Sequence, residues 1–306
     1  MPSTSSLKSL FDPTKINILS DSLEFLFELR KNGYETSNLL SLERLPTNSI
    51  VFSFTDNAAK HAFEIAKETD RKKCIFCATH VFEPSIYAAS YSLNLLLNSD
   101  FIGALRAQEK LLSLLDNCSE LLISGPHTSG KLRIRADSIP YAMIEEDVRE
   151  NFIHSVAEFF EVHYAHMNPE KACPFNFEGK IEISGILTVL RKSPASLSKH
   201  LKPALHRLAQ EIAKKKATLT VTNNKISSLL IGSTEYKTLL EEAAGARGLF
   251  LTEFAIGVNS SLAPIIDYSI NSQLNEGIAG IHVAIGDGST GYHIDFLSPN
   301  ATVAAA

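Results

Sequence analysis

The first 130 residues alternate between two hydrophobic patterns. Short runs rich in β-branched and aromatic residues are typical of strands, and longer runs with apolar residues three or four apart are typical of helices. This strand–helix alternation predicts an α/β domain with a parallel sheet, preceded by a lead-in over residues 1–20. The expected strands are 49–54, 73–79 and 120–124, and the expected helices are one between Ser22 and Gly33, one that begins at Asp56, and two at about 84–97 and 100–116.

The pattern changes after the turn-forming cluster 125–130. His163 and His166 have helical spacing and are interpreted as one helix face rather than as metal ligands. We expect an α/β N-terminal domain (residues 1–130) followed by an α+β, largely antiparallel C-terminal domain (residues 131–306). In this second part the expected helices are 145–164, about 194–216 and 234–244, and the expected strands are 131–135, 217–221, 226–231, 248–256, 280–285 and 292–296.

The charge balance narrows the range of partners. Lys and Arg number 29 against 34 Asp and Glu, and this net charge of −5 argues against a protein that binds nucleic acid by neutralising phosphates. The N-terminus lacks the apolar core of a secretory signal, and no window is long and apolar enough for a membrane span. Four cysteines are too few for a disulfide scaffold. We therefore expect a cytoplasmic protein that binds neither nucleic acid nor a membrane.

Two histidines and an aspartate near the C-terminus form the clearest candidate site. Residues i and i+2 of a strand share a face, so His293 and Asp295 project together if 292–296 is a strand. His282 lies in the preceding expected strand, and the glycine-rich segment 286–291 is short enough for a hairpin. Two imidazoles and a carboxylate are the ligand set of catalytic zinc and of non-haem iron sites. The alternative is a pair of exposed hairpin residues and one core histidine.

Residues 217–295 resemble the closing part of the aminopeptidase T family of metallopeptidases. In order, that family has LTVENGRV, a helix rich in Leu, Glu and Ala, a strand with a metal-binding Glu, a GTNPG loop, DEK..GT.HIALG and H.D. The corresponding segments here are LTVTNNKI (219–226), YKTLLEEAA (236–244), LTEFAIGVN (251–259), NEGIAGIHVAIG (275–286) and HID (293–295). The resemblance implies that Glu253, His282, His293 and Asp295 are metal ligands, with Glu253 in a position to bridge two ions.

The catalytic residues that the resemblance implies are less well matched. The family has a further glutamate in a P.GEVF.AP segment, and the nearest match, in 169–174, makes Glu170 a candidate ligand or base beside Glu253. The family also has a catalytic tyrosine after the HIALG histidine. In the shortened segment here the only tyrosine is Tyr292, although strand alternation points it to the other face from His293. The N-terminal domain is trimmed relative to the family.

Three functions therefore remain open. The first is a metal-dependent peptidase or amidohydrolase with one or two divalent ions. Zinc is the expected metal, and iron is the alternative. The second is a non-catalytic peptide-binding protein, because some relatives of the family are truncated proteins that bind precursor peptides in natural-product pathways. The third is a mononuclear non-haem iron dioxygenase, like the branch that cleaves dihydroxypyridine rings. The expected partner is a peptide or small amide substrate, with a homodimer as the assembly to be tested.

Overall fold

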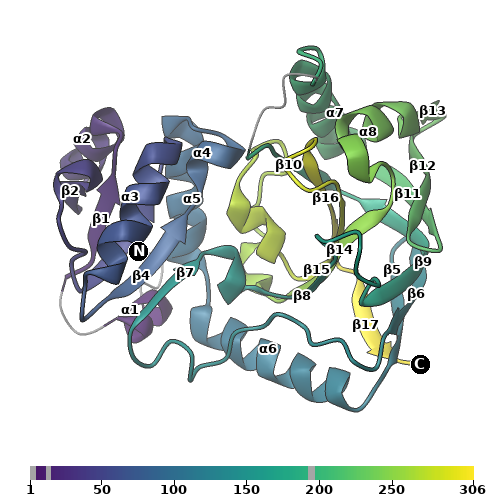
Figure 1. Cartoon of the computed structure of the whole chain (residues 1–306), viewed down its shortest axis with the longest axis horizontal. Coiled ribbons are helices and arrows are strands. Elements are labelled where there is room, and N and C mark those ends of the chain that lie inside the picture. Colours follow the sequence, from purple (N-terminus) through teal and green to yellow (C-terminus); the bar gives the residue numbers. More distant parts are fainter. Residues whose placement is uncertain (1–4, 12–14, 192–196) are drawn as a thin grey trace.

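A parallel sheet forms the N-terminal part of the molecule. The computed structural model describes residues 5–11, 15–191 and 197–306. In Figure 1 this sheet lies on the left and the antiparallel sheets on the right. Its five strands all run parallel, in the order β2 (Glu35–Asn38), β1 (Asn17–Ser20), β3 (Asn48–Phe52), β4 (Lys73–Cys77) and β7 (Phe152–Ser155).

Helices cover both faces of this sheet. Helix α3 packs on one face through Ala58, Ala62 and Ile65, which recur at helical spacing, and the Thr55 hydroxyl caps its first turn. The other face packs against α1, α2, α5 and α6. The helices of this part are α1 (Ser5–Leu10), α2 (Leu23–Lys31), α3 (Asp56–Lys67), α4 (Thr79–Phe82), α5 (Ile86–Asn98) and α6 (Phe101–Asp116), with short 3-10 turns at Leu39–Ser41 and Ala157–Phe159.

Two antiparallel sheets form the rest of the described chain. The smaller has the order β10 (Gly185–Val189), β16 (His293–Pro299), β15 (Gly280–Ile285), β14 (Leu251–Gly257) and β8 (Glu161–Ala165). The larger has the order β13 (Thr234–Glu235), β12 (Lys225–Ile231), β11 (Ala217–Thr222), β9 (Phe175–Ile183), β6 (Thr128–Ile134), β5 (Glu120–Gly125) and β17 (Thr302–Ala305). The helices here are α7 (Leu201–Lys215) and α8 (Lys237–Ala243), with 3-10 turns at Gly245–Arg247, Ser260–Leu262 and Gln273–Gly277.

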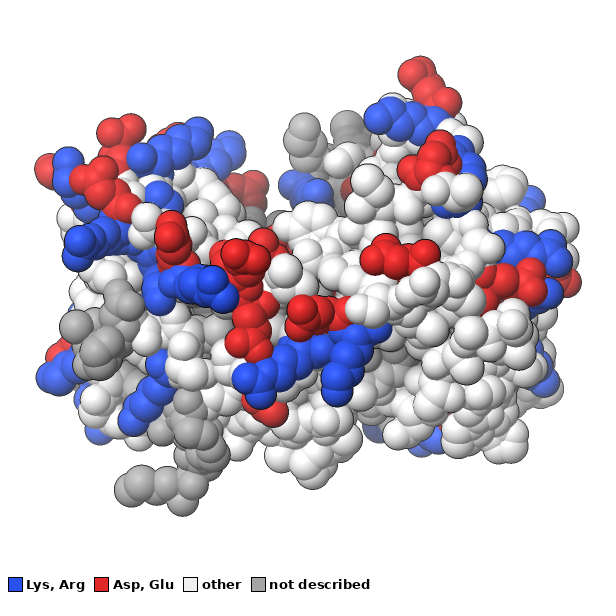
Figure 2. Space-filling view, turned by 90° about the horizontal axis from the view of Figure 1, so that it is seen from below, with Lys and Arg blue, Asp and Glu red and all other residues white. Residues whose placement is uncertain are grey.

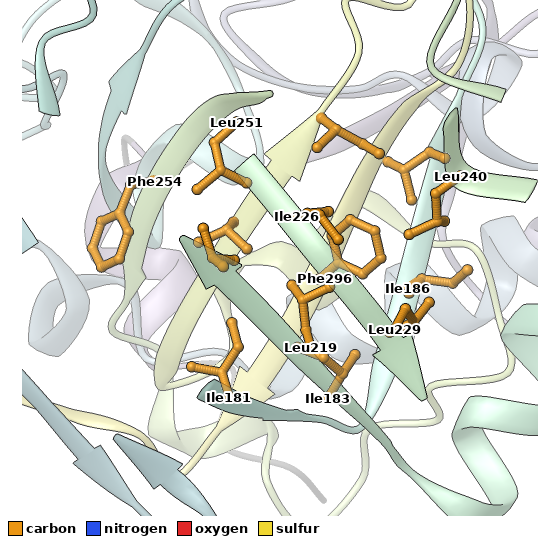
Figure 3. Packing of buried hydrophobic residues seen from close by; sticks show 14 of the residues in the cluster. Ile181, Ile183, Ile186, Leu219, Ile226, Leu229, Leu240, Leu251, Phe254 and Phe296 are labelled. Atoms are coloured by element: carbon orange, nitrogen blue, oxygen red, sulfur yellow. The ribbon is translucent and has the colours of Figure 1, made fainter. Parts of the chain in front are cut away.

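The two antiparallel sheets pack face to face over one hydrophobic core. Phe254 of the smaller sheet packs against Phe175 and Phe177 of β9 in the larger one. Phe296, Leu219 and Ile181 belong to the same buried cluster (Figure 3). Because strand residues alternate between faces, the neighbours of Phe254 and Phe296 in sequence point away from this core. The smaller sheet therefore has one apolar face, buried in the core, and one face that carries the polar residues.

The fold class expected from the sequence is confirmed: a parallel α/β part precedes antiparallel sheets. No helix in the described ranges is long and apolar enough to cross a membrane. The cluster 125–130 contains the turn between β5 and β6, at Pro126 and His127, and these two strands pair in one sheet. The division into domains at residue 130 stays a prediction. On the face seen in Figure 2, basic and acidic side chains are interspersed rather than gathered into a patch of one sign.

The expected helix 145–164 is wrong. The segment instead forms β7, which completes the parallel sheet, a 3-10 turn, and β8, which lies at the edge of the smaller antiparallel sheet. The apolar residues Val148, Phe152, Val156 and Phe160 are spaced four apart and are all buried, which imitates one helix face. The pairing of two strands with two different sheets therefore overrides a pattern that locally fits a helix.

Two further segments differ from the sequence prediction in where their helices or strands begin. The sequence assigns no helix or strand to the lead-in over 1–20, but this segment contains α1 and β1, and β1 lies between β2 and β3 in the parallel sheet. Residues 1–4 and 12–14 lie outside the described residues. The helix expected from about 194 begins at Leu201, and residues 192–196 lie outside the described residues. The later start places Pro203 in the first turn of α7, where a missing N–H costs no helical hydrogen bond.

Candidate metal centre

A hairpin brings His282, His293 and Asp295 to one face. Strands β15 and β16 pair antiparallel, with His282 opposite Leu297 and Ala284 opposite Asp295. Residues opposite each other share a face, as do residues two apart in one strand. The hairpin that the sequence predicts is thus confirmed, and its three polar side chains project from the face away from the core.

Glu253 joins this face from the next strand. A β-bulge between Leu251 and Glu253 re-aims the strand, and Glu253 then lies opposite Ala284. Bulges are common next to functional sites because they change the direction of a side chain. The small side chain of Ala284 stands between Glu253 and Asp295 in the same row, and it leaves the space in front of the sheet free for their carboxylates.

Glu161 and His163 complete the face from β8. His163 lies opposite Ala255, and Glu161 lies opposite Gly257 in the pairing of β8 with β14. The small residues at these positions of β14 again leave the polar side chains room. The polar face therefore carries three imidazoles and at least three carboxylates, contributed by four adjacent strands.

The side chains lie within a few ångströms of one another. His282 Nε2 is 3.4 Å from Glu253 Oε1 and 3.6 Å from Glu161 Oε2, and His293 Nε2 is 3.0 Å from Asp295 Oδ1 and 3.7 Å from Glu253 Oε2. On the β8 side, His163 Nδ1 is 3.2 Å from Glu161 Oε1. Glu161, His163 and Glu253 each offer one ligand atom within 4.8 Å of the others, a spacing that could hold a metal ion.

Several polar atoms of this cluster lack the hydrogen bonds that burial normally demands. His282 is 1% exposed, yet neither of its ring nitrogens forms a hydrogen bond with a residue in the described part of the chain. The same is true of Glu161 Oε2 and Asp295 Oδ2. Leaving a buried polar atom unpaired costs about 1–3 kcal/mol. A cation coordinated by these atoms would remove that cost, so the donor set fits a metal ion.

The orientation of His293 also fits a metal ligand. Its Nδ1 donates a hydrogen bond to the carbonyl oxygen of Gly286, at 3.1 Å. Metal-binding histidines commonly donate one ring N–H to a carbonyl group, which fixes the ring and leaves the other nitrogen for the ion. Here Nε2 remains, and it points at the carboxylates of Asp295 and Glu253.

In this cluster positively charged imidazoles lie next to negatively charged carboxylates, and each shifts the pKa of the other. Burial alone would raise the pKa of Glu253, but the imidazoles of His282, His163 and His293 lower it to about 2. Burial would lower the pKa of His293, but the carboxylates of Asp295 and Glu253 raise it to about 9. Protons thus supply the positive charge that balances the carboxylates. Since metal ligands must be deprotonated, an ion would replace these protons.

A further glutamate, Glu276, lies beside the cluster. Burial and the neighbouring carboxylates of Asp295 and Glu161 raise its pKa well above the ordinary value, against the opposing effect of Arg191. It comes from the 3-10 turn Gln273–Gly277, in the segment that matches the DEK motif of the family resemblance. The neighbouring carboxylates thus favour the neutral form of Glu276, and a cation bound beside it would favour the ionised form instead.

The sequence interpretation overlooked Glu161, proposed Glu170 in its place, and assigned His163 and His166 to a helix face. That helix face is wrong, because His163 lies on strand β8 and His166 directly follows it. Glu170 lies in an exposed turn, where its backbone N–H donates to Asn168, and the structure does not bring it to the cluster. The signal for Glu161 was present: Glu161-Val162 and Ala165 match the Glu-Val and Ala of the GEVF.AP motif. The expected helix 145–164 concealed it.

Tyr292 also lies away from the cluster. Its ring packs in the core between the antiparallel sheets and is 7% exposed. Burial raises the pKa of its hydroxyl. Strand alternation predicts this placement, because Tyr292 directly precedes His293 and takes the opposite face.

The polar face lines a cavity of about 720 Å³. The opposite wall comes from the parallel sheet and its helices, at the carboxyl ends of β4 and β7. This is the edge at which open α/β sheets bind ligands. The candidate metal centre contributes Glu161, His163, Glu253, His293 and Asp295 to the lining.

Replacing Gly286 with alanine should disturb both the hairpin and the centre. Gly286 has φ +76°, and an added Cβ would overlap the carbonyl oxygen of Tyr292, next to His293. We expect the free energy of unfolding to fall by about 1–3 kcal/mol in urea titrations, with loss of metal affinity. Gly232→Ala is the control, since Gly232 also has a positive φ (+59°) but open space around it. Equal effects of the two substitutions would contradict this account of Gly286.

Comparisons with known proteins give a family and a distant likeness of fold. The family model described as crocagin biosynthetic protein CgnE/B matches residues 14–306. No curated protein matches the chain at a significant level. Among solved structures, AmpT from Thermus thermophilus is 12% identical, with 96% of this chain and 90% of that chain covered and a TM-score of 0.49. A 2,5-dihydroxypyridine dioxygenase from Pseudomonas putida KT2440 is 8% identical, with 98% and 91% covered and a TM-score of 0.46. Identities this low say nothing about activity.

Proposed function

Because the chain belongs to the family of the crocagin biosynthetic protein CgnE/B, we propose that it is a metal-dependent biosynthetic protein that acts on an amide bond of a peptide or small amide. The observation that carries the proposal is the convergence of three imidazoles and three carboxylates on one face of the smaller antiparallel sheet, where all but His282 line the cavity. Several of their buried polar atoms have no hydrogen-bond partner among the described residues. The proposed ligands are Glu161, His163, Glu253, His282, His293 and Asp295.

The arrangement of the ligands suits one or two ions. Glu253 lies between the pair Glu161/His163 on one side and the pair His293/Asp295 on the other, so its two oxygens could be shared. Nitrogen and carboxylate ligands of this kind suit zinc, and iron is the alternative. A divalent ion held here would polarise an amide carbonyl and lower the pKa of a bound water molecule.

The protein's own residues would position the substrate and accept a proton. Of the two glutamates expected to act as a base, Glu253 lies in the cavity and Glu170 does not. The neighbouring imidazoles lower the pKa of Glu253 to about 2, so its carboxylate is ionised at neutral pH. In this form it would hold an ion as a ligand or, if one oxygen were left free of metal, accept a proton from water. The walls of the cavity would hold the substrate and limit the access of bulk water.

A second candidate function is peptide binding without turnover. Neither Tyr292 nor Glu170 reaches the cavity, so two of the three residues expected to take part in catalysis are absent from it. A cavity of this size could still bind a peptide segment. The description of the family, as biosynthetic proteins, is compatible with either function.

Hydrolysis of short peptides by the metal-loaded protein separates the two candidates. We expect the wild type to release products from a panel of tripeptides, followed by mass spectrometry, and Glu253→Gln to lower the rate at least 100-fold. Glu170→Gln is the matched control and should retain the wild-type rate. Bound peptide with no product from the wild type would favour the non-catalytic function. A bound iron ion with consumption of oxygen would favour a dioxygenase.

A further inference from the structure

The wall of the cavity that faces the metal centre is largely apolar. Helix α3 contributes Ala59 and Phe63, which are four residues apart and so share one helix face. Strand β4 contributes Phe76, and α4 contributes Val81 and Phe82. The two halves of the cavity therefore differ in chemistry: one offers charged ligand atoms, and the other offers mainly hydrocarbon and aromatic surface, with a few polar side chains.

Phe63 stands out on this wall because it is 42% exposed. Its ring packs against that of Phe76, with centroids 4.9 Å apart, and one side is left open. Met167, 41% exposed, lines the same cavity from the segment after β8. Large exposed apolar side chains beside a cavity commonly mark the place where an apolar group of a ligand binds.

Asp56 and Lys60 of α3 and the imidazole of His80 interrupt the apolar wall. The hydroxyl group of Ser53 holds the Nδ1 of His80 at 2.8 Å. Its Nε2 has Asp56 Oδ1 at 3.7 Å, too far for a hydrogen bond, and forms none within the described ranges. Burial lowers the pKa of His80, against the opposing effect of Asp56 and the Ser53 backbone, so the ring is neutral at pH 7. A fixed, neutral imidazole can form a hydrogen bond with a peptide group.

We propose that this wall is a subsite for a large apolar or aromatic side chain of a peptide, with Phe63, Phe76 and Phe82 in contact with the side chain and His80 hydrogen-bonded to the adjoining peptide group. The subsite rests on the proposed function, because it assumes that a peptide enters the cavity. It adds the class of residue that is selected. A peptide whose large apolar residue sits here would place a neighbouring amide bond near the metal centre, across the same cavity.

The absence of tryptophan from the chain makes a direct binding test feasible. The probe is the peptide acetyl-Gly-Trp-Gly-amide, whose fluorescence reports its own environment. We expect the metal-loaded wild type to shift its emission, and acetyl-Gly-Leu-Gly-amide to compete at least fivefold better than acetyl-Gly-Ala-Gly-amide. Phe63→Ala should weaken binding of the probe about tenfold, the effect of losing roughly 1.4 kcal/mol of aromatic contact.

Controls separate this proposal from the proposed function. Phe27→Ala removes a phenylalanine that is 55% exposed on α2 and does not line the cavity, and it should bind the probe like the wild type. His80→Ala should weaken the binding of the leucine peptide and of the alanine peptide by a similar factor, about 2- to 10-fold. Metal content should be unchanged in all three variants, because none of them removes a proposed ligand.

Several results would overturn the subsite. They are an unshifted emission of the probe with the wild type, equal competition by the leucine and alanine peptides, or binding by Phe63→Ala within twofold of the wild type. Wild-type protein that binds no metal would instead overturn the proposed function. Failure of the subsite and failure of the proposed function are therefore distinguishable.

Discussion

Replacing His293 with alanine is expected to reduce bound metal from one or two equivalents to less than about 0.1 equivalent per chain, while the protein stays folded. His293 is held by Gly286 and aimed at Asp295 and Glu253, so its loss removes an oriented ligand and leaves the carboxylates without a shared partner. Loss of one oriented ligand is expected to cost more than the 10- to 100-fold in affinity that loss of a supporting residue costs. The measurement is elemental analysis after gel filtration, with circular dichroism to verify the fold.

His206→Ala is the matched control for this substitution. His206 is exposed on α7 and belongs to no part of the candidate centre, so its replacement should leave metal content unchanged. Metal content that is equal in His293→Ala and the wild type would show that the ion, if any, is bound elsewhere.

Removal of the metal with a chelator is expected to lower the melting temperature by roughly 5–15 °C. A ligand that binds only the folded state stabilises it by about 4 kcal/mol at a concentration 1,000 times its dissociation constant. In chains of roughly 150–250 residues, 1 kcal/mol corresponds to roughly 2–4 °C, and in this longer chain to somewhat less. The carboxylates of Glu161, Glu253 and Asp295 lie close together, and without an ion they depend on protonated histidines for balance.

Differential scanning calorimetry with and without EDTA measures this effect. His293→Ala should melt at nearly the same temperature in both conditions, because it has no ion to lose. Identical melting temperatures of the wild type with and without EDTA would mean that protonated histidines alone balance the carboxylates of the cluster. That result would contradict a metal ion that stabilises the folded protein.

The part of the site that could be predicted is the part built from local pattern. The alternation of side chains along a strand placed His293 and Asp295 on one face. The short, glycine-rich turn predicted that this strand forms a hairpin with the strand of His282. Both depend on neighbouring residues only. Glu253 required the family resemblance, since β14 is buried along its whole length and shows no alternation.

The part that could not be predicted depends on long-range pairing. Glu161 and His163 lie on β8, which is placed beside β14 by contacts with residues more than 80 positions away along the chain. Their segment carries apolar residues four apart, so local pattern favours a helix, and a helix would have turned Glu161 and His163 away from each other. The cavity itself lies between the parallel sheet and the smaller antiparallel sheet, and no local sequence pattern indicates that these two sheets face each other.

The N-terminal wall illustrates the same division. The helix that begins at Asp56 and the strand at 73–79 were predicted correctly, but nothing in the sequence showed that Phe63 and His80 would face the metal centre. Their partners across the cavity are nearly 200 residues further along the chain. The sequence therefore predicts the elements of this wall but not the ligand surface that they form.

Anomalous X-ray diffraction from crystals of the zinc-loaded protein, collected on both sides of the zinc absorption edge, would locate the bound ions. We expect one or two strong anomalous peaks on the polar face of the smaller antiparallel sheet, within coordination distance of His282, His293, Glu253 and Asp295. A second ion would also lie near Glu161 and His163. Crystals without a peak at this face, with these side chains hydrogen-bonded only to one another and to water, would contradict the candidate metal centre.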